Sequence, residues 1–230
     1  MFFNTEPTQY DLRFNLFNIP VRISAWFWLM GAVFGFNAVE LGAEYLLLWM
    51  GILFVSILVH EFGHALVAKA FGYRPHVLLY HFGGLAMYQP DSRYTASRSV
   101  AISLAGPSAG FALFGLTELF KYYVFPSMIP GLSRSSLMLL SFAIIQMEWI
   151  NLYWGLINLL PVLPLDGGRI CQEICLKISP RRGVIYAAQT GAVVSGVAAA
   201  FFFTQEMLYP AILFASLCAT NIQAAQQRQW

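Results

Sequence analysis

Long apolar runs separated by short polar stretches are the feature that most constrains the fold of this chain. Only 10% of its 230 residues are charged and 58% are hydrophobic, whereas a soluble domain carries about 25% charged residues. A helix of about 20 apolar residues crosses the roughly 30 Å of a bilayer's hydrocarbon core. The runs are continuous rather than alternating, which excludes a β-barrel pattern. The sequence therefore predicts an all-α polytopic membrane protein.

Six of these runs are long enough to cross a bilayer. We expect spans at about residues 21–39, 45–70, 99–120, 137–160, 184–203 and 207–225. Residues 73–94 combine prolines and a glycine pair with the β-prone stretch 77–80, and they predict a short β-hairpin or re-entrant loop. A loop rich in Pro, Ser and Gly is expected at 121–136, and a short amphipathic segment at 168–178.

The distribution of basic residues predicts the orientation of these spans. With six spans and the N-terminus inside, eleven of the thirteen Lys and Arg residues lie on the inner side, and Lys121 and Arg134 lie outside. Cytoplasmic loops carry such an excess, so both termini are expected in the cytoplasm. Three cysteines form no disulfide framework. A net charge of +2 indicates no nucleic-acid partner.

The second run contains the segment His60-Glu61-Phe62-Gly63-His64. On a helix, the i, i+4 spacing places His60 and His64 on one face, one turn apart, where their imidazoles can hold one Zn²⁺. Glu61 lies on the neighbouring face and can reach a water molecule without binding the metal. Polar groups at membrane depth are costly, so a chance occurrence of all three is a poor explanation.

Asp166 is the candidate for the third protein ligand that a catalytic zinc needs. It lies between the prolines Pro161 and Pro164 and the pair Gly167-Gly168, where the fourth run ends. Irregular backbone is tolerated at membrane depth only where protein or water covers it. The alternative is that Asp166 caps the amphipathic helix that follows. Both roles can hold in part, and we favour the ligand.

Several weaker signals have competing interpretations. Gly106 and Gly110 form a small-xxx-small face, which favours close helix packing near the zinc site over a substrate contact. Glu148 and Asn151 lie one turn apart within the fourth run, where they line a water path or pair with each other.

The glycine-rich loop and the amphipathic segment raise two further questions. His81 is a fourth ligand, a substrate contact, a gating group or an ordinary hydrogen-bonded histidine. Cys171 and Cys175, spaced i, i+4, either bind a metal or remain two reduced thiols.

In the order and spacing of its motifs, the chain resembles the site-2 protease family of intramembrane zinc metalloproteases. The matching stretches are residues 60–64, 83–84, 105–110 and 158–169. They lie within residues 45–170, which the resemblance marks as the catalytic core of a single membrane domain, 1–230. Many members of the family carry a PDZ or a CBS domain, and neither is expected in this chain.

The resemblance implies a role for each residue of the expected site. One Zn²⁺ per chain is held by His60, His64 and Asp166, with Glu61 as general base. Asn158 positions the substrate or steadies the oxyanion. The glycine-rich loop, with Gly83, Gly84 and His81, is expected to contact the substrate.

The expected function is intramembrane hydrolysis of peptide bonds in transmembrane protein substrates, known as regulated intramembrane proteolysis. The active site is expected nearer the cytoplasmic face of the cell membrane. A catalytically silent adaptor that binds transmembrane helices and a zinc transporter are the alternatives; the first has no need of Glu61, and the second has polar residues along a whole path. The expected partners are the bilayer and the substrate, with a homo-oligomer or a regulatory membrane protein as further possibilities.

Overall fold

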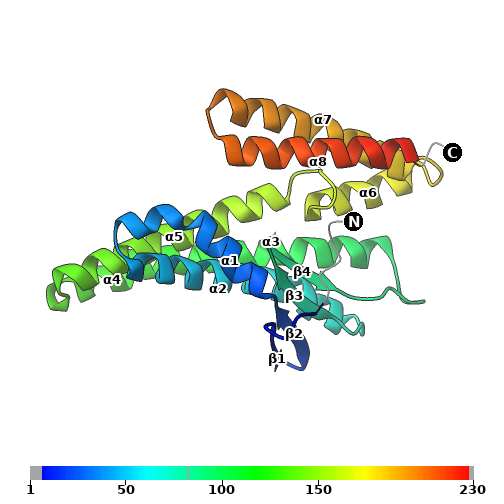
Figure 1. Cartoon of the computed structure of the whole chain (residues 1–230). Coiled ribbons are helices and arrows are strands. Elements are labelled where there is room, and N and C mark those ends of the chain that lie inside the picture. The colour runs from blue at the N-terminus through cyan, green and yellow to red at the C-terminus, as the bar shows by residue number, and fades with distance from the viewer. Residues whose placement is uncertain (1–6, 82, 228–230) are drawn as a thin grey trace. The chain divides into compact units, whose positions relative to one another are not determined.

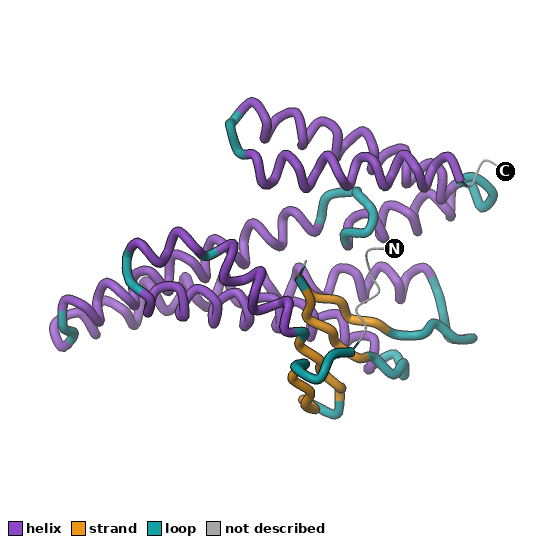
Figure 2. The backbone as a smooth tube through the Cα atoms, in the orientation of Figure 1, coloured by secondary structure: helices purple, strands orange, loops and turns teal. Residues whose placement is uncertain are grey.

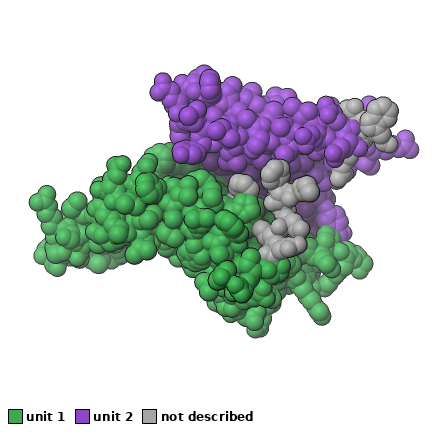
Figure 3. Space-filling model, in the orientation of Figure 1, with its two compact units in different colours: residues 1–93, 105–155 green, residues 94–104, 156–230 purple. Residues whose placement is uncertain are grey.

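The computed structural model describes residues 7–81 and 83–227, and it is largely helical with one small sheet (Figures 1 and 2). Two compact units are distinguished (Figure 3). The first comprises residues 1–93 and 105–155, and the second residues 94–104 and 156–230. The single membrane domain that the sequence suggests stays a prediction.

The sheet belongs to the first unit. Its strands, in spatial order, are β1 (Leu12–Leu16), β2 (Ile19–Ile23), β3 (His76–Tyr80) and β4 (Gly83–Met87). The outer pairs are antiparallel, and β2 runs parallel to β3. The hairpin of β3 and β4 lies within the expected segment 73–94. The hairpin of β1 and β2 was not expected; Phe17 and Asn18 at its turn both have positive φ, as two-residue hairpin turns of type I′ require.

The first expected span is divided among three elements. Residues 21–23 are the last three residues of β2. The apolar residues that follow form α1 (Ala25–Phe34) and the 3₁₀ helix η1 (Phe36–Glu40). The next helix, α2 (Ala43–Ala70), coincides with the second expected span. The indole of Trp49 in α2 donates a hydrogen bond to the Gly31 carbonyl in α1 at 3.1 Å. A sixth crossing at residues 21–39 stays a prediction.

Within the described residues, five helices are long and apolar enough to cross a membrane, and they match the second to sixth expected spans. They are Ala43–Ala70, Ala96–Gly131, Arg134–Asn158, Gly183–Thr204 and Leu208–Gln227. The expected loop at 121–136 is largely helical instead. Helix α3 (Ala96–Leu119) continues through the π-helix η2 (Phe120–Val124), α4 (Phe125–Met128) and the 3₁₀ helix η3 (Ile129–Gly131). The prolines of α4 and η3 stand in the first turn, where no intrahelical N–H is needed.

Apolar packing between the sheet and α2 forms the core of the first unit. The buried side chains on the inner sheet face and on α2 are Ile19, Val21, Ile23, Val77, Leu79, Ala86, Ile57, Phe62 and Ala65. Period-two alternation places every second residue of β2 on this face. The sheet is thereby fixed against the half of α2 that carries the two histidines.

The second unit contains the C-terminal helices. Helix α5 (Arg134–Asn158) ends at its border. The amphipathic α6 (Asp166–Ile178) packs against α7 (Gly183–Thr204), and α7 lies along α8 (Leu208–Gln227) (Figure 1). Asn221 of α8 is 1% exposed, and its amide nitrogen donates to the Leu163 carbonyl at 2.7 Å. The loop between α5 and α6 is thus fastened to α8.

Candidate metal centre

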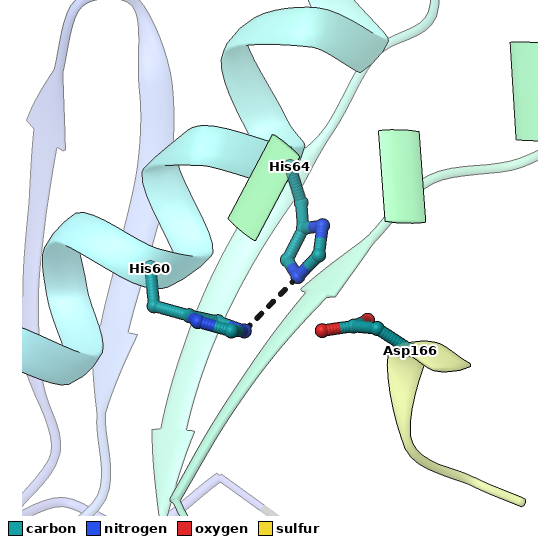
Figure 4. Close-up of side chains that lie close together, drawn as sticks. All are labelled: His60, His64 and Asp166. Carbon is teal, nitrogen blue, oxygen red and sulfur yellow. Dashed lines mark hydrogen bonds between the residues drawn. The ribbon is translucent and has the colours of Figure 1, made fainter. Parts of the chain in front are cut away.

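Two histidines of α2 converge in the way that two ligands of one metal ion do. His60 and His64 are 3% and 8% exposed, and their Nε2 atoms lie 3.2 Å apart (Figure 4). Tetrahedral zinc with Zn–N distances of about 2.05 Å separates two nitrogen ligands by about 3.3 Å. Glu61, between them in sequence, is also buried. The i, i+4 geometry expected from the sequence is present.

Asp166 is the first residue of α6 and is 9% exposed. The N-cap residue of α6 is Leu165, whose side chain makes no capping hydrogen bond. Asp166 is therefore not the N-cap of this helix, which was its alternative role. The ligand atoms of His60, His64 and Asp166 lie within 4.8 Å of one another (Figure 4). Two imidazoles and one carboxylate are a donor set that zinc accepts, and the residues therefore fit the ion.

Glycines approach the site closely from two elements. A Cβ atom at Gly84 of β4 would lie 2.6 Å from Oε1 of Glu61, and one at Gly106 of α3 would lie 2.7 Å from Cδ2 of His64. Gly83 has a φ of +126°, a conformation that favours glycine. The close helix packing expected at Gly106 is therefore a contact between the Gly106 backbone and the His64 ring. Contacts of Gly83 and Gly84 with a substrate stay a prediction.

The turn that carries Asp166 is held by residues of the second unit. A Cβ at Gly167 or Gly168 would lie 2.5 Å from the backbone of Leu160 or Leu163 respectively, so both glycines allow the first turn of α6 to pack on the preceding loop. Asn221 anchors that loop. The sequence analysis did not single out Asn221, although a polar residue within an apolar run is a signal that could have found it.

Tyr80 of β3 is a second residue that the sequence analysis missed. It is 7% exposed, and burial followed by the negative charge of Glu61 raises the pKa of its hydroxyl. A tyrosine in an apolar strand carries no functional signal of its own, since the type is common in strands.

The remaining candidates have the following surroundings. Asn158 is the last residue of α5 and is 9% exposed. His81 stacks edge-on against Tyr80, with ring centroids 5.2 Å apart, and it lies outside the metal-binding group found among the described residues.

The Cys171 and Cys175 sulfurs are 4.0 Å apart. Burial and then the neighbouring thiol raise the pKa of Cys171, which favours reduced thiols over a thiolate metal site.

Glu148 and Asn151 do not pair with each other. Glu148 accepts a hydrogen bond from Lys121 at 2.7 Å, and Lys121 also bonds Glu118. Asn151 donates to Ser56 of α2 at 2.9 Å and to the Met147 carbonyl at 2.8 Å. Both residues thus connect elements of the first unit.

Comparison with known proteins places these residues in context. The model of peptidase family M50 matches residues 126–203, which include Asn158 and Asp166. A protein from Synechocystis sp., provisionally named a zinc metalloprotease, is 33% identical over 192 residues, covering 77% of this chain and 48% of its own length. A zinc metalloprotease from Methanocaldococcus jannaschii is 30% identical over 172 residues, covering 74% and 47% respectively. The chain spans about half the length of these curated relatives.

A solved structure shares the fold. The site-2 protease from Methanocaldococcus jannaschii superposes with a TM-score of 0.66 and 22% sequence identity, over 94% of this chain and 95% of that one. At this identity the likeness concerns the arrangement of helices and strands. It supports the expected fold for nearly the whole chain.

Proposed function

Because this chain belongs to peptidase family M50, the site-2 proteases, we propose that it is a membrane-embedded zinc metalloprotease. Its substrates are membrane proteins, cut within or near their transmembrane segments, as in regulated intramembrane proteolysis. The observation that carries the proposal is the pair His60 and His64, with Nε2 atoms 3.2 Å apart beside the buried Glu61, inside an apolar helix of 28 residues.

His60, His64 and Asp166 hold one Zn²⁺ per chain. Zinc, when bound, supplies a Lewis acid that activates water and polarises a carbonyl group. Glu61 takes a proton from the attacking water and returns it to the leaving amine. Asn158 steadies the negative charge that develops on the carbonyl oxygen of the substrate.

A substrate helix must unwind locally, because its carbonyl groups are hydrogen-bonded internally. Strand β4 is an edge of the described sheet, and it carries Gly84 directly beside Glu61. An extended segment that pairs along β4 would pass close to the general base. Gly83, Gly84 and His81 are the residues that we assign to this contact.

The charge distribution supports an orientation with both termini in the cytoplasm and the site nearer the cytoplasmic face of the cell membrane. Single cysteines introduced at Arg134 and at Arg182 test it with a membrane-impermeant maleimide on intact cells. Labelling is expected at position 134 only. Labelling at position 182 but not at position 134 would reverse the orientation.

The substitution Glu61→Gln is the sharpest test of the activity. The variant should keep about one zinc per chain, because Glu61 is not a ligand, and it should lose cleavage. Quantitative proteomics of membranes should then show substrates that accumulate in cells with Glu61→Gln and not with Glu40→Gln, a charge-matched control at an exposed residue. His60→Ala should lose zinc as well as cleavage.

The same experiment separates the alternatives. A silent adaptor predicts identical membrane proteomes for wild type and Glu61→Gln, and this result would refute the proposed protease. A zinc transporter predicts zinc flux into proteoliposomes, which the proposed protease does not produce.

A further inference from the structure

A basic cavity lies where α2 meets the sheet, away from the metal centre. It measures about 570 Å³ and is lined by Asn18, Pro20, Lys69, Tyr73, Arg74, Pro75 and His76. Lys69 and Arg74 bring positive charge to it, and no acidic residue is among the described lining residues. None of the proposed catalytic steps uses this cavity.

The Tyr73 side chain is a fixed part of the cavity wall. Its side chain is 4% exposed, and its hydroxyl has no hydrogen-bond partner within the described part of the chain. The hydroxyl oxygen is shielded from solvent, so it does not serve as a donor to a ligand in the cavity. The ring itself is held by Tyr88, at a centroid distance of 5.1 Å, and by the Arg93 guanidinium, at 5.6 Å.

The position of the cavity along α2 indicates where this ligand comes from. Helix α2 has 28 residues and is therefore about 42 Å long, which equals the thickness of a bilayer including both headgroup layers. Lys69 lies in its last turn, and Tyr73 to His76 follow directly. The cavity consequently lies at the level of the lipid headgroups, whichever side of the membrane this is.

An apolar side chain adjoins the basic groups. Phe17, at the turn of the β1–β2 hairpin, is 66% exposed, and its carbonyl accepts a hydrogen bond from Lys69 Nζ at 2.6 Å. The Phe17 ring also touches Phe62 of α2 edge-on, with centroids 6.1 Å apart. A phosphate group beside an exposed aromatic ring is the chemistry of a phospholipid at the membrane interface.

We propose that this cavity binds the phosphate of an anionic phospholipid headgroup, with Lys69 and Arg74 as its donors. The Phe17 ring lies against the first carbons of the acyl chains. The proposal is independent of the proteolytic activity, because it concerns a different set of residues and its test measures lipid binding alone.

Native mass spectrometry of the full chain in detergent, titrated with phosphatidylglycerol or phosphatidylcholine, tests the site. Phosphatidylglycerol should bind in preference, and Lys69→Gln/Arg74→Gln should weaken it about thirtyfold, at about 1 kcal/mol per basic residue near an anionic surface. The control Arg134→Gln/Arg181→Gln removes the same charge outside the cavity and should leave binding unchanged.

Two further variants keep the test decisive if the double variant fails to fold. Arg74→Gln alone retains the bond between Lys69 and Phe17, and Lys69→Gln alone retains the Arg74 guanidinium; each should weaken phosphatidylglycerol binding severalfold. Equal binding of both lipids, or equal losses in the control, would overturn the site. If an equal concentration of inorganic phosphate displaced the lipid, the ligand of the cavity would be free phosphate rather than a membrane lipid.

Discussion

Gly84 and Glu61 illustrate how closely single residues fit around the metal centre. No side chain larger than hydrogen fits at Gly84 unless Glu61 moves, since a Cβ would lie 2.6 Å from its Oε1. A displacement of about 1 Å at a catalytic group can cost about a hundredfold in rate. The position of the Glu61 carboxylate, the proposed general base, is therefore set by a residue that has no chemistry of its own.

We expect Gly84→Ala to lower the rate of substrate cleavage by about a hundredfold while zinc content and folding remain close to wild type. The rate is measured on a substrate identified by the Glu61→Gln comparison. Gly115→Ala is the matched control, because no atom lies within 4 Å of its added Cβ. Equal rates for the two variants would refute the role assigned to Gly84.

At this scale the sequence predicted the placement of the two histidines but not the residues that surround them. His60 and His64 have the geometry that their spacing predicts, because a helix alone fixes it. Tyr80 and Asn221 could not be predicted, since both act through contacts made by the folded chain. Asp166 was predicted from its type and its proximity to prolines, yet its place at the start of α6 is known only from the structure.

Among the secondary-structure elements, α8 holds the loop before Asp166 in place, a role that its apolar sequence does not indicate. Asn221 is buried, and its amide bonds the Leu163 carbonyl in the loop that leads to Asp166. Ser195 and Gly191 of α7 allow close packing there, and the Gly191 position faces the Asn221 side chain. The last two helices thus support the turn that carries Asp166, the proposed acidic ligand.

Asn221→Leu should therefore lower both stability and activity. Loss of the hydrogen bond leaves the Leu163 carbonyl without its donor, at a cost of about 1–3 kcal/mol, and thermal unfolding in detergent reports it as a lower Tm. Cleavage should fall in proportion to the zinc lost. Thr220→Val is the control, since the Thr220 hydroxyl bonds only the Leu217 carbonyl of its own helix. A wild-type Tm for Asn221→Leu would contradict this role.

Elements dominated by hydrophobicity were predicted well, and those set by pairing were not. The five long helices follow the apolar runs closely. Strands β1 and β2 were missed because they are fixed by pairing: β1 pairs with β2 across the turn at Phe17, and β2 pairs with the distant β3. The segment 121–136 was read as a loop because of its prolines, although proline is accepted in a first turn.

For the whole molecule, metal binding should be linked to folding stability. A ligand that binds only the folded state at a thousandfold excess over its Kd stabilises it by about 4 kcal/mol. Treatment with 1,10-phenanthroline should therefore abolish cleavage and lower the Tm of the wild type, and added Zn²⁺ should restore both.

The double variant His60→Ala/His64→Ala provides the control for this linkage. Its Tm should start lower and should not respond to the chelator or to Zn²⁺. If the Tm of the wild type did not change on chelation, metal binding by the histidine pair would contribute nothing to the stability of the fold. Restoration by Mg²⁺ would contradict the donor set, since magnesium prefers oxygen ligands.

The parallel pairing of β2 with β3 has a consequence for how the chain is made. Val21 pairs with Val77, and the Ser24 amide bonds the Leu79 carbonyl, yet all of α1 and α2 is synthesised between them. Strand β2 can pair with β1 at once, but its other edge has no partner until α1 and α2 have been synthesised and β3 follows them. Closure of the sheet therefore comes only after both helices have been made, and a ribosome-stalled nascent chain that ends before β3 should leave the β1–β2 hairpin more open to protease than the full chain does.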